Sequence, residues 1–111
     1  FVGGFTGKAI DERVTANGLA HEFLEVEGQC RINVKIKSIT ETDINGTGAI
    51  VTENDVKRLT ARLNELLKPD DWLIICGSVP PSLDDKTYEN LLGQIKQVKN
   101  INIVVDCLPT P

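Results

Sequence analysis

Three basic side chains and one amide lie close together in one stretch of the sequence. Arg31, Lys35 and Lys37 are spaced by four and two residues, with Asn33 between them and no acidic residue interleaved. Residues two or four apart share a face of an extended strand. The planar guanidinium of arginine fits phosphate, so the pattern indicates an anion site. The alternative is a solvated strand face, which we favour for Lys35 and Lys37. For Arg31 both interpretations stay open, because Asn33 could hydrogen-bond the same ligand.

A second position for chemistry is the turn at Gly77 and Ser78, directly after the apolar run of residues 72–76. If that run is a strand of an open parallel sheet, the turn lies at the carboxyl end of the strand, where such sheets bind ligands. Glycine permits close backbone approach, and the free N–H groups of a following helix suit a phosphate or a sugar hydroxyl. The alternative is a tight strand-to-helix turn whose angle is set by Pro80-Pro81, and spacing alone favours this turn.

The glycines and carboxylates elsewhere give weaker signals. The glycine-rich start of the chain, residues 3–7, precedes a predicted helix but matches neither the dinucleotide-binding spacing nor the P-loop. Acidic pairs at residues 70–71 and 84–85 are explained by turns or helix caps. Asp106, at the end of a predicted strand, is the best isolated acid. None of these patterns by itself predicts a catalytic pair.

The sulfur and imidazole side chains do not predict a metal site. His21 is the single histidine, without a cysteine or carboxylate at ligand spacing, so neither a metal centre nor a Ser-His-Asp hydrolase is expected. Cys30, Cys76 and Cys107 are far apart and lie in apolar runs. This favours reduced, buried thiols in a cytoplasmic protein over a disulfide or metal ligands.

The bulk composition limits the class of protein. The chain has 111 residues, 16 acidic and 12 basic side chains, a net charge of −4 and 41% hydrophobic residues, which is typical of one soluble globular domain. The negative charge and the single Trp and Tyr argue against a nucleic-acid partner. The longest apolar run, residues 72–76, is too short to cross a membrane. Because the sequence has no methionine, we expect a piece of a longer protein.

Periodicity predicts the elements that would position these residues in the first half of the chain. We predict a helix at residues 6–18, strands at 21–26 and 29–39, a turn at 43–48 and a short strand at 49–51. Asn17-Gly18 would end the helix with a left-handed residue. Alternating apolar and polar residues define the long strand, which Glu27-Gly28 would join to the preceding one. These strands would form a separate layer or a lid.

The second half predicts a strand-helix-strand crossover preceded by another helix. The elements are a helix from Thr52 to Pro69, a strand at residues 72–76, a helix whose apolar stripe ends at Val98, and a strand at 101–106. Thr52 with Asp55 is a capping pattern, as is Ser82 with Asp85. The continuous apolar run at 72–76 favours a strand buried on both faces of a parallel sheet. The crossover should be right-handed, and the segment belongs to the α/β class.

Four motifs occur in an order that resembles one enzyme family. They are GGFTG at residues 3–7, GQCRINVKI at 28–36, TDINGTG at 42–48 and CGSVPP at 76–81. In this order they resemble the ribokinase-like (PfkB-type) carbohydrate kinases. The resemblance implies an α/β ribokinase-like fold, in which helices flank a parallel sheet and a β lid is added. Residues 1–111 would be an incomplete, central part of the kinase domain.

The resemblance also implies an activity. Kinases of this family use ATP and Mg²⁺ to phosphorylate a hydroxyl of a sugar phosphate. The motifs favour fructose 1-phosphate, with tagatose 6-phosphate and fructose 6-phosphate as alternatives. By motif, Arg31 would hold the phosphate already on the substrate, with Asn33 beside it, and Gly77 and Ser78 would lie near the bound sugar phosphate.

The same resemblance implies that the catalytic base lies outside this segment. The base belongs to a Gly-Ala-Gly-Asp motif, which is expected beyond Pro111, so no catalytic residue is assigned within residues 1–111. The main ATP and Mg²⁺ ligands are also expected outside the segment. The segment alone should therefore be inactive.

Two other interpretations stay open. A non-enzymatic α/β module that binds phosphate or a protein partner would share the same cationic strand face. That face could also dock against a partner subunit, as lid strands do in some relatives. Because an incomplete sheet leaves apolar strands without neighbours, we expect a homodimer or a poorly soluble chain. The expected small-molecule partners are a sugar phosphate and ATP, and neither nucleic acid nor a membrane is expected.

Overall fold

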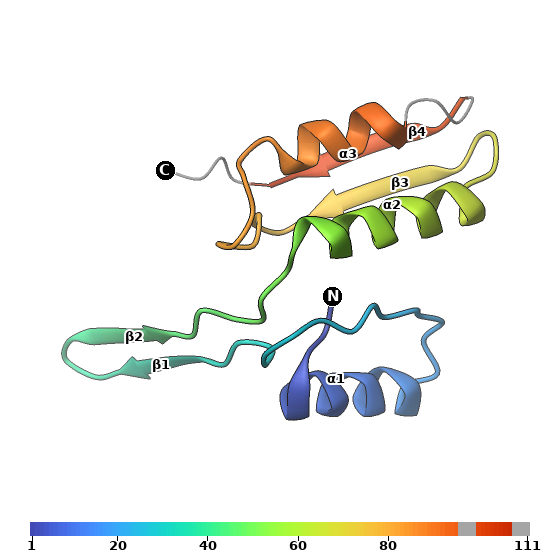
Figure 1. The fold of residues 1–111 in the computed structure, drawn as a ribbon. Helices are drawn as coiled ribbons and strands as arrows, with labels where there is room; N and C mark the ends of the chain where they lie inside the picture. Colours follow the sequence, from blue (N-terminus) through green and yellow to red (C-terminus); the bar gives the residue numbers. More distant parts are fainter. Residues whose placement is uncertain (96–99, 108–111) are drawn as a thin grey trace. The chain divides into compact units, whose positions relative to one another are not determined.

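The computed structural model describes residues 1–95 and 100–107. In chain order the elements are α1 (Gly4–Ala16), β1 (Asn33–Lys37), β2 (Glu41–Asn45), α2 (Glu53–Leu66), β3 (Trp72–Cys76), α3 (Thr87–Ile95) and β4 (Asn102–Asp106) (Figure 1). They divide into two compact units, Phe1–Val51 and the part from Thr52 onward. Each unit is described by itself. The predicted α/β class is confirmed.

Two predictions are not tested by the structure. The predicted end of the helical stripe at Val98 lies outside the described residues, and so does Pro111. The catalytic base expected beyond Pro111 is therefore untested by the structure and stays a prediction.

Helix α1 of the first unit ends where the sequence predicts. The Asn17 side-chain amide donates to the Arg13 carbonyl at 2.7 Å, and the Asn17 backbone N–H donates to the same oxygen at 3.2 Å. Gly18 follows with φ +68°, in the left-handed region that glycine adopts without strain. The chain then turns back toward the start of the helix. Val2 pairs there with residues 24–26 through two backbone hydrogen bonds, Val2 N–H to Leu24 O at 3.0 Å and Val26 N–H to Val2 O at 2.9 Å.

The hairpin of the first unit differs from the predicted one. Strands β1 and β2 pair antiparallel, from Asn33 opposite Asn45 to Lys37 opposite Glu41, so the turn is at residues 38–40. The predicted strand at residues 21–26 is wrong, and the strand predicted at 29–39 is shorter, at Asn33–Lys37. Glu25 only bridges to Val2, and Glu27 to Ile50. The predicted turn at 43–48 is wrong for its first three residues, which belong to β2. Thr42 and Ile44 are β-branched and prefer a strand, and this preference outweighs the turn signal of the residues around them.

The two faces of the hairpin have opposite character. Val34 lies opposite Ile44, and Ile36 opposite Thr42, so one face is apolar. Val34, Ile36 and Ile44 are 44%, 50% and 56% exposed. The hairpin extends away from α1 (Figure 1). The homodimer is expected from the uncovered strands of the second unit and stays a prediction.

The second unit begins with the helix that the capping pattern predicts. The Asp55 N–H donates to Thr52 Oγ1 at 3.2 Å, and the Thr52 N–H donates to Asp55 Oδ2 at 2.9 Å. This reciprocal pair is a complete capping box at the start of α2. The hydrogen bonds from Thr52, and then the Arg58 guanidinium, lower the pKa of Asp55. The carboxylate therefore stays ionised and in place as the cap.

Strands β3 and β4 form a parallel pair joined by the crossover that contains α3 (Figure 1). The register runs from Trp72 opposite Asn102 to Cys76 opposite Asp106. Helices α2 and α3 contact each other, and Leu91 and Ile95 of α3 are buried. The crossover thus brings the turn after β3 next to the carboxyl end of β4.

The expectation that β3 is buried on both faces is wrong for the described residues. Leu73 and Ile75 are partly buried, whereas Trp72 is 67% and Ile74 63% exposed. Alternate residues of a strand point to opposite faces. Within the described residues the β3–β4 pair is therefore covered on one face only.

Candidate functional site

Arg31 lies directly before β1, at the base of the hairpin. A Cβ built on Gly46 would be 3.4 Å from Arg31 Cβ and 3.1 Å from the Ile32 carbonyl oxygen, and one built on Gly48 would be 3.7 Å from Arg31 Cβ. The Gly46 N–H donates to the Ile32 carbonyl at 3.2 Å. The chain that follows β2 therefore passes close against Arg31, and Gly46 has little room for a side chain. These contacts fix the position of the Arg31 backbone.

The Arg31 side chain is exposed and has no competing partner in the described part of the chain, where it makes neither a hydrogen bond nor an ion pair. Asn33, two residues on, is the first residue of β1 and lies opposite Asn45. Guanidinium and amide groups together offer several N–H donors. The structure therefore brings the predicted pair Arg31 and Asn33 to one region of the first unit, with donors suited to an anion.

The two lysines of the same strand are in a different electrostatic setting. Lys35 lies opposite Asp43, and Lys37 opposite Glu41. Directly opposite residues have Cβ atoms about 4.5–5.5 Å apart, within reach of charge pairing. Strand β1 itself contains no acidic residue, but β2 places one opposite each lysine. This arrangement supports the solvated-face interpretation for both lysines.

Gly77 and Ser78 follow β3 in the second unit. Gly77 has φ +94° and no atom within 4 Å of the position of a Cβ. Its N–H donates to the Asp106 carbonyl oxygen at 3.2 Å, and the Tyr88 hydroxyl donates to the Ser78 carbonyl oxygen, also at 3.2 Å. The turn thus lies at the carboxyl ends of both parallel strands, as predicted. Arg31 and Asn33 belong to the first unit and Gly77 and Ser78 to the second.

The start of α1 is occupied by the protein's own groups. The Thr6 N–H donates to the Gln29 side-chain oxygen at 3.2 Å, and the Gly3 N–H donates to the Cys30 sulfur at 3.3 Å. The Thr6 hydroxyl donates to the Cys30 carbonyl at 2.8 Å. Gln29 and Cys30 therefore satisfy donors that an isolated helix start leaves free. The glycine-rich start has a structural role, and it anchors the two residues that precede Arg31.

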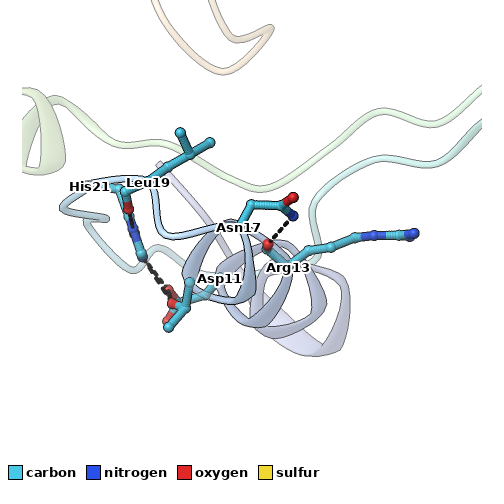
Figure 2. Close-up of polar contacts among 6 residues, drawn as sticks. Asp11, Arg13, Asn17, Leu19 and His21 are labelled. Carbon is cyan, nitrogen blue, oxygen red and sulfur yellow. Dashed lines mark hydrogen bonds and ion pairs between the residues drawn. The ribbon is translucent and has the colours of Figure 1, made fainter.

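His21 forms a clasp between α1 and the loop that follows it (Figure 2). One ring nitrogen, Nε2, lies 2.6 Å from Asp11 Oδ1, and the other, Nδ1, lies 2.7 Å from the Leu19 carbonyl oxygen. Both partners accept hydrogen bonds, so this geometry favours the imidazolium form, in which both ring nitrogens carry a proton. The hydrogen bond to Leu19 and then the one to Asp11 raise the pKa of His21. Both ring nitrogens contact the protein's own groups, which gives His21 a structural role.

We predict that this clasp makes stability depend on pH. Because the pKa of His21 is raised on folding, its contribution is fully present below the unfolded value and is lost as pH rises through the folded value. The melting temperature of the chain should therefore fall between about pH 5.5 and about pH 8.5, and by less in His21→Gln. Thermal unfolding of both proteins at the two pH values measures this. An equal fall in the two proteins would contradict the clasp.

The remaining acids and thiols form no second site in the described residues. Asp71 accepts from the Lys68 N–H at 2.8 Å and Asp84 from the Lys86 N–H at 2.7 Å, which confirms their turn and capping roles. Within residues 1–95 and 100–107, His, Cys, Asp and Glu side chains form no group of three or more that could hold a metal ion. Cys76 is exposed, in contrast to the expected buried thiol. None of the described helices has the length and apolar character required to cross a bilayer.

Comparison with known proteins finds relatives that match nearly the whole chain. A family model described as pfkB family carbohydrate kinase matches residues 1–111. The chain is 40% identical to 1-phosphofructokinase of Bacillus subtilis (strain 168) over 106 residues, which cover 96% of this chain and 34% of the relative. It is 31% identical to D-tagatose-1-phosphate kinase of Bacillus licheniformis over 115 residues, covering 97% and 38%.

A solved structure resembles the chain over most of its length. The crystal structure of a candidate phosphofructokinase from Staphylococcus aureus matches with a TM-score of 0.81 and 32% identity, covering 95% of this chain and 34% of that one. This likeness agrees with the fold that the motifs predict. The chain spans about a third of the length of the relatives it matches.

Proposed function

The chain belongs to the pfkB family of carbohydrate kinases, and on that premise we propose that residues 1–111 are the central part of a sugar-phosphate kinase domain. The whole enzyme transfers the γ-phosphoryl group of ATP to a hydroxyl of a sugar phosphate. We favour fructose 1-phosphate as the substrate, because 1-phosphofructokinase of Bacillus subtilis is more similar to the chain than the tagatose-1-phosphate kinase. The product is then fructose 1,6-bisphosphate.

The observation that supports this function most directly is the setting of Arg31. Its side chain is exposed and makes no hydrogen bond or ion pair within the described residues, and the close passage of Gly46 and Gly48 against its Cβ holds its backbone at the hairpin base. In our proposal Arg31 binds the phosphate already present on the sugar, and Asn33 donates to the same group. The motif at residues 76–81 is our reason for adding Gly77 and Ser78 to the proposed sugar-phosphate ligands. Phosphoryl transfer depends on positioning and charge neutralisation, and an arginine clamp supplies both.

ATP and Mg²⁺ belong to this proposal as cosubstrate and cofactor. The described residues contain no cluster of three or more potential metal ligands. The sequence up to Pro111 contains no Gly-Ala-Gly-Asp motif, so the proposal keeps the catalytic base beyond that residue. No step is therefore assigned to a metal held by the described residues. The role of this segment is to bind and orient the acceptor.

The function is tested by a coupled kinase assay on the intact gene product that contains this chain. Fructose 1-phosphate, fructose 6-phosphate, tagatose 1-phosphate and tagatose 6-phosphate are each offered with ATP and Mg²⁺. We expect kcat/KM to be highest for fructose 1-phosphate, by about tenfold, which corresponds to the net value of one hydrogen bond, about 1.4 kcal/mol. The 111-residue chain alone should give no turnover.

Two results would change the assignment. A higher kcat/KM for another of the four sugar phosphates would change the assigned substrate and leave the kinase function in place. No turnover with any of them, together with calorimetric binding of a sugar phosphate to the chain, would support a non-enzymatic phosphate-binding module.

A further inference from the structure

The turn after β3 is held from two directions by groups that are distant in the sequence. On one side the Gly77 N–H donates to the carbonyl oxygen of Asp106, the last residue of β4. On the other side the Tyr88 hydroxyl of α3 donates to the Ser78 carbonyl oxygen. The first contact belongs to the backbone and is independent of side-chain type. The second depends on a single hydroxyl group.

The surroundings of Tyr88 keep that hydroxyl protonated. Partial burial, and then the charges that Cys107 and Cys76 would acquire on ionisation, raise the pKa of Tyr88. Cys76 ends β3, and Cys107 follows the end of β4. The phenol group is therefore a hydrogen-bond donor throughout the physiological pH range, and it lies near the carboxyl ends of both strands.

The contact leaves the ligand-binding groups of Ser78 available. Within residues 1–95 and 100–107, neither the backbone N–H nor the hydroxyl of Ser78 has a hydrogen-bond partner. Gly77, in the left-handed region, has open space where a side chain would be. A glycine hinge next to a serine could adopt several backbone conformations. A hydrogen bond to the Ser78 carbonyl favours one of them.

We propose that Tyr88 is a positioning residue of the sugar-phosphate site, which acts by holding the Ser78 carbonyl so that the serine N–H and hydroxyl are presented to the ligand. The inference rests on the proposed function, because it assigns the ligand of this turn to the acceptor sugar phosphate. Its physical basis is preorganisation: a turn that is already in its bound conformation does not have to be ordered when the ligand arrives. Loss of the hydroxyl should weaken binding of the sugar phosphate and leave the chemical step unchanged.

The test is Tyr88→Phe in the intact gene product, which removes one oxygen and keeps the ring. Because a neutral hydrogen bond has a modest net value, we expect KM for the sugar phosphate to rise about three- to tenfold. The kcat value and KM for ATP should stay within about twofold, as for a contact that is equal in ground and transition states. The matched control is Thr87→Val, which removes a hydroxyl from the neighbouring residue and should leave all three constants unchanged. An unchanged KM for the sugar phosphate in Tyr88→Phe would overturn the inference.

A second measurement separates this inference from the proposed function. Amide hydrogen exchange at Gly77, without ligand, should be faster in Tyr88→Phe than in Thr87→Val, because the turn is then held on one side only. If the unmodified enzyme turns over and KM for the sugar phosphate is unaffected in Tyr88→Phe, the positioning role of Tyr88 is refuted and the kinase function stands. If the unmodified enzyme shows no turnover, the proposed kinase function is refuted, and the positioning role of Tyr88 is then tested by hydrogen exchange at Gly77 alone. Equal exchange in the two variants would refute it.

Discussion

Replacement of Gly3 by alanine is expected to lower the free energy of unfolding by about 3 kcal/mol, the upper part of the range for overpacking. A Cβ at this position would lie 2.6 Å from the Gly28 carbonyl oxygen and 2.8 Å from the Val26 carbonyl oxygen. Both are backbone atoms, so no side-chain rotation can relieve the overlap. The Gly3 carbonyl also accepts from the Cys30 N–H at 3.1 Å. A shift of Gly3 would therefore disturb the segment that leads to Arg31.

Urea unfolding of the 111-residue chain, followed by circular dichroism, measures this loss. Gly93→Ala is the matched control, because Gly93 lies within α3 and no atom is within 4 Å of a Cβ built there. Alanine is the better helix former, so the control should gain about 0.5–1 kcal/mol. A loss below about 1 kcal/mol in Gly3→Ala would mean that the backbone approaches Gly3 less closely than described.

Arg31→Ala in the intact gene product should raise KM for the sugar phosphate by about 30- to 100-fold. The estimate corresponds to the loss of charge-assisted hydrogen bonds of about 2–3 kcal/mol, at 1.4 kcal/mol for each factor of ten. Arg31→Lys keeps the charge but loses the planar fork, and it should have an intermediate effect. Steady-state kinetics with the sugar phosphate varied at saturating ATP measures both variants.

Lys37→Ala is the control for Arg31, because it also removes a cation from the hairpin. Lys37 lies opposite Glu41 and is exposed, so its removal should change KM less than about twofold, because exposed surface charges contribute little. If Arg31→Ala left KM unchanged, or if Lys37→Ala changed it equally, the assignment of the phosphate to Arg31 would be wrong.

The elements of the second unit could be predicted closely from the sequence because local signals there agree. Thr52 and Asp55 form the expected capping box, and the apolar run at Trp72–Cys76 is a strand with those bounds. In the hairpin the local signals conflict. Residues 45–48 contain the glycines that usually mark a turn, whereas the actual turn at residues 38–40 contains neither Gly, Asn nor Pro. The sequence signal therefore placed the turn after the second strand and not before it.

The candidate site shows the same division. The side-chain types of Arg31 and Ser78 are visible in the sequence, but the contacts that position them are not. Gln29, which accepts from Thr6 at the start of α1, is 23 residues away from it in the sequence. Tyr88 is ten residues away from Ser78, whose carbonyl oxygen accepts its hydrogen bond. No periodicity relates such partners, because tertiary folding and not helix or strand geometry brings them together. The acids opposite Lys35 and Lys37 were missed because the pairing of β1 with β2 was not predicted.

The exposed position of Trp72 provides an optical probe of the second unit. It is the single tryptophan of the chain, and it lies on the face of β3 that the described residues leave uncovered. Indole emission shifts to shorter wavelength when water is removed from the ring. Any surface that closes over this face of the β3–β4 pair would therefore be detected directly, without a label, from the colour of the fluorescence.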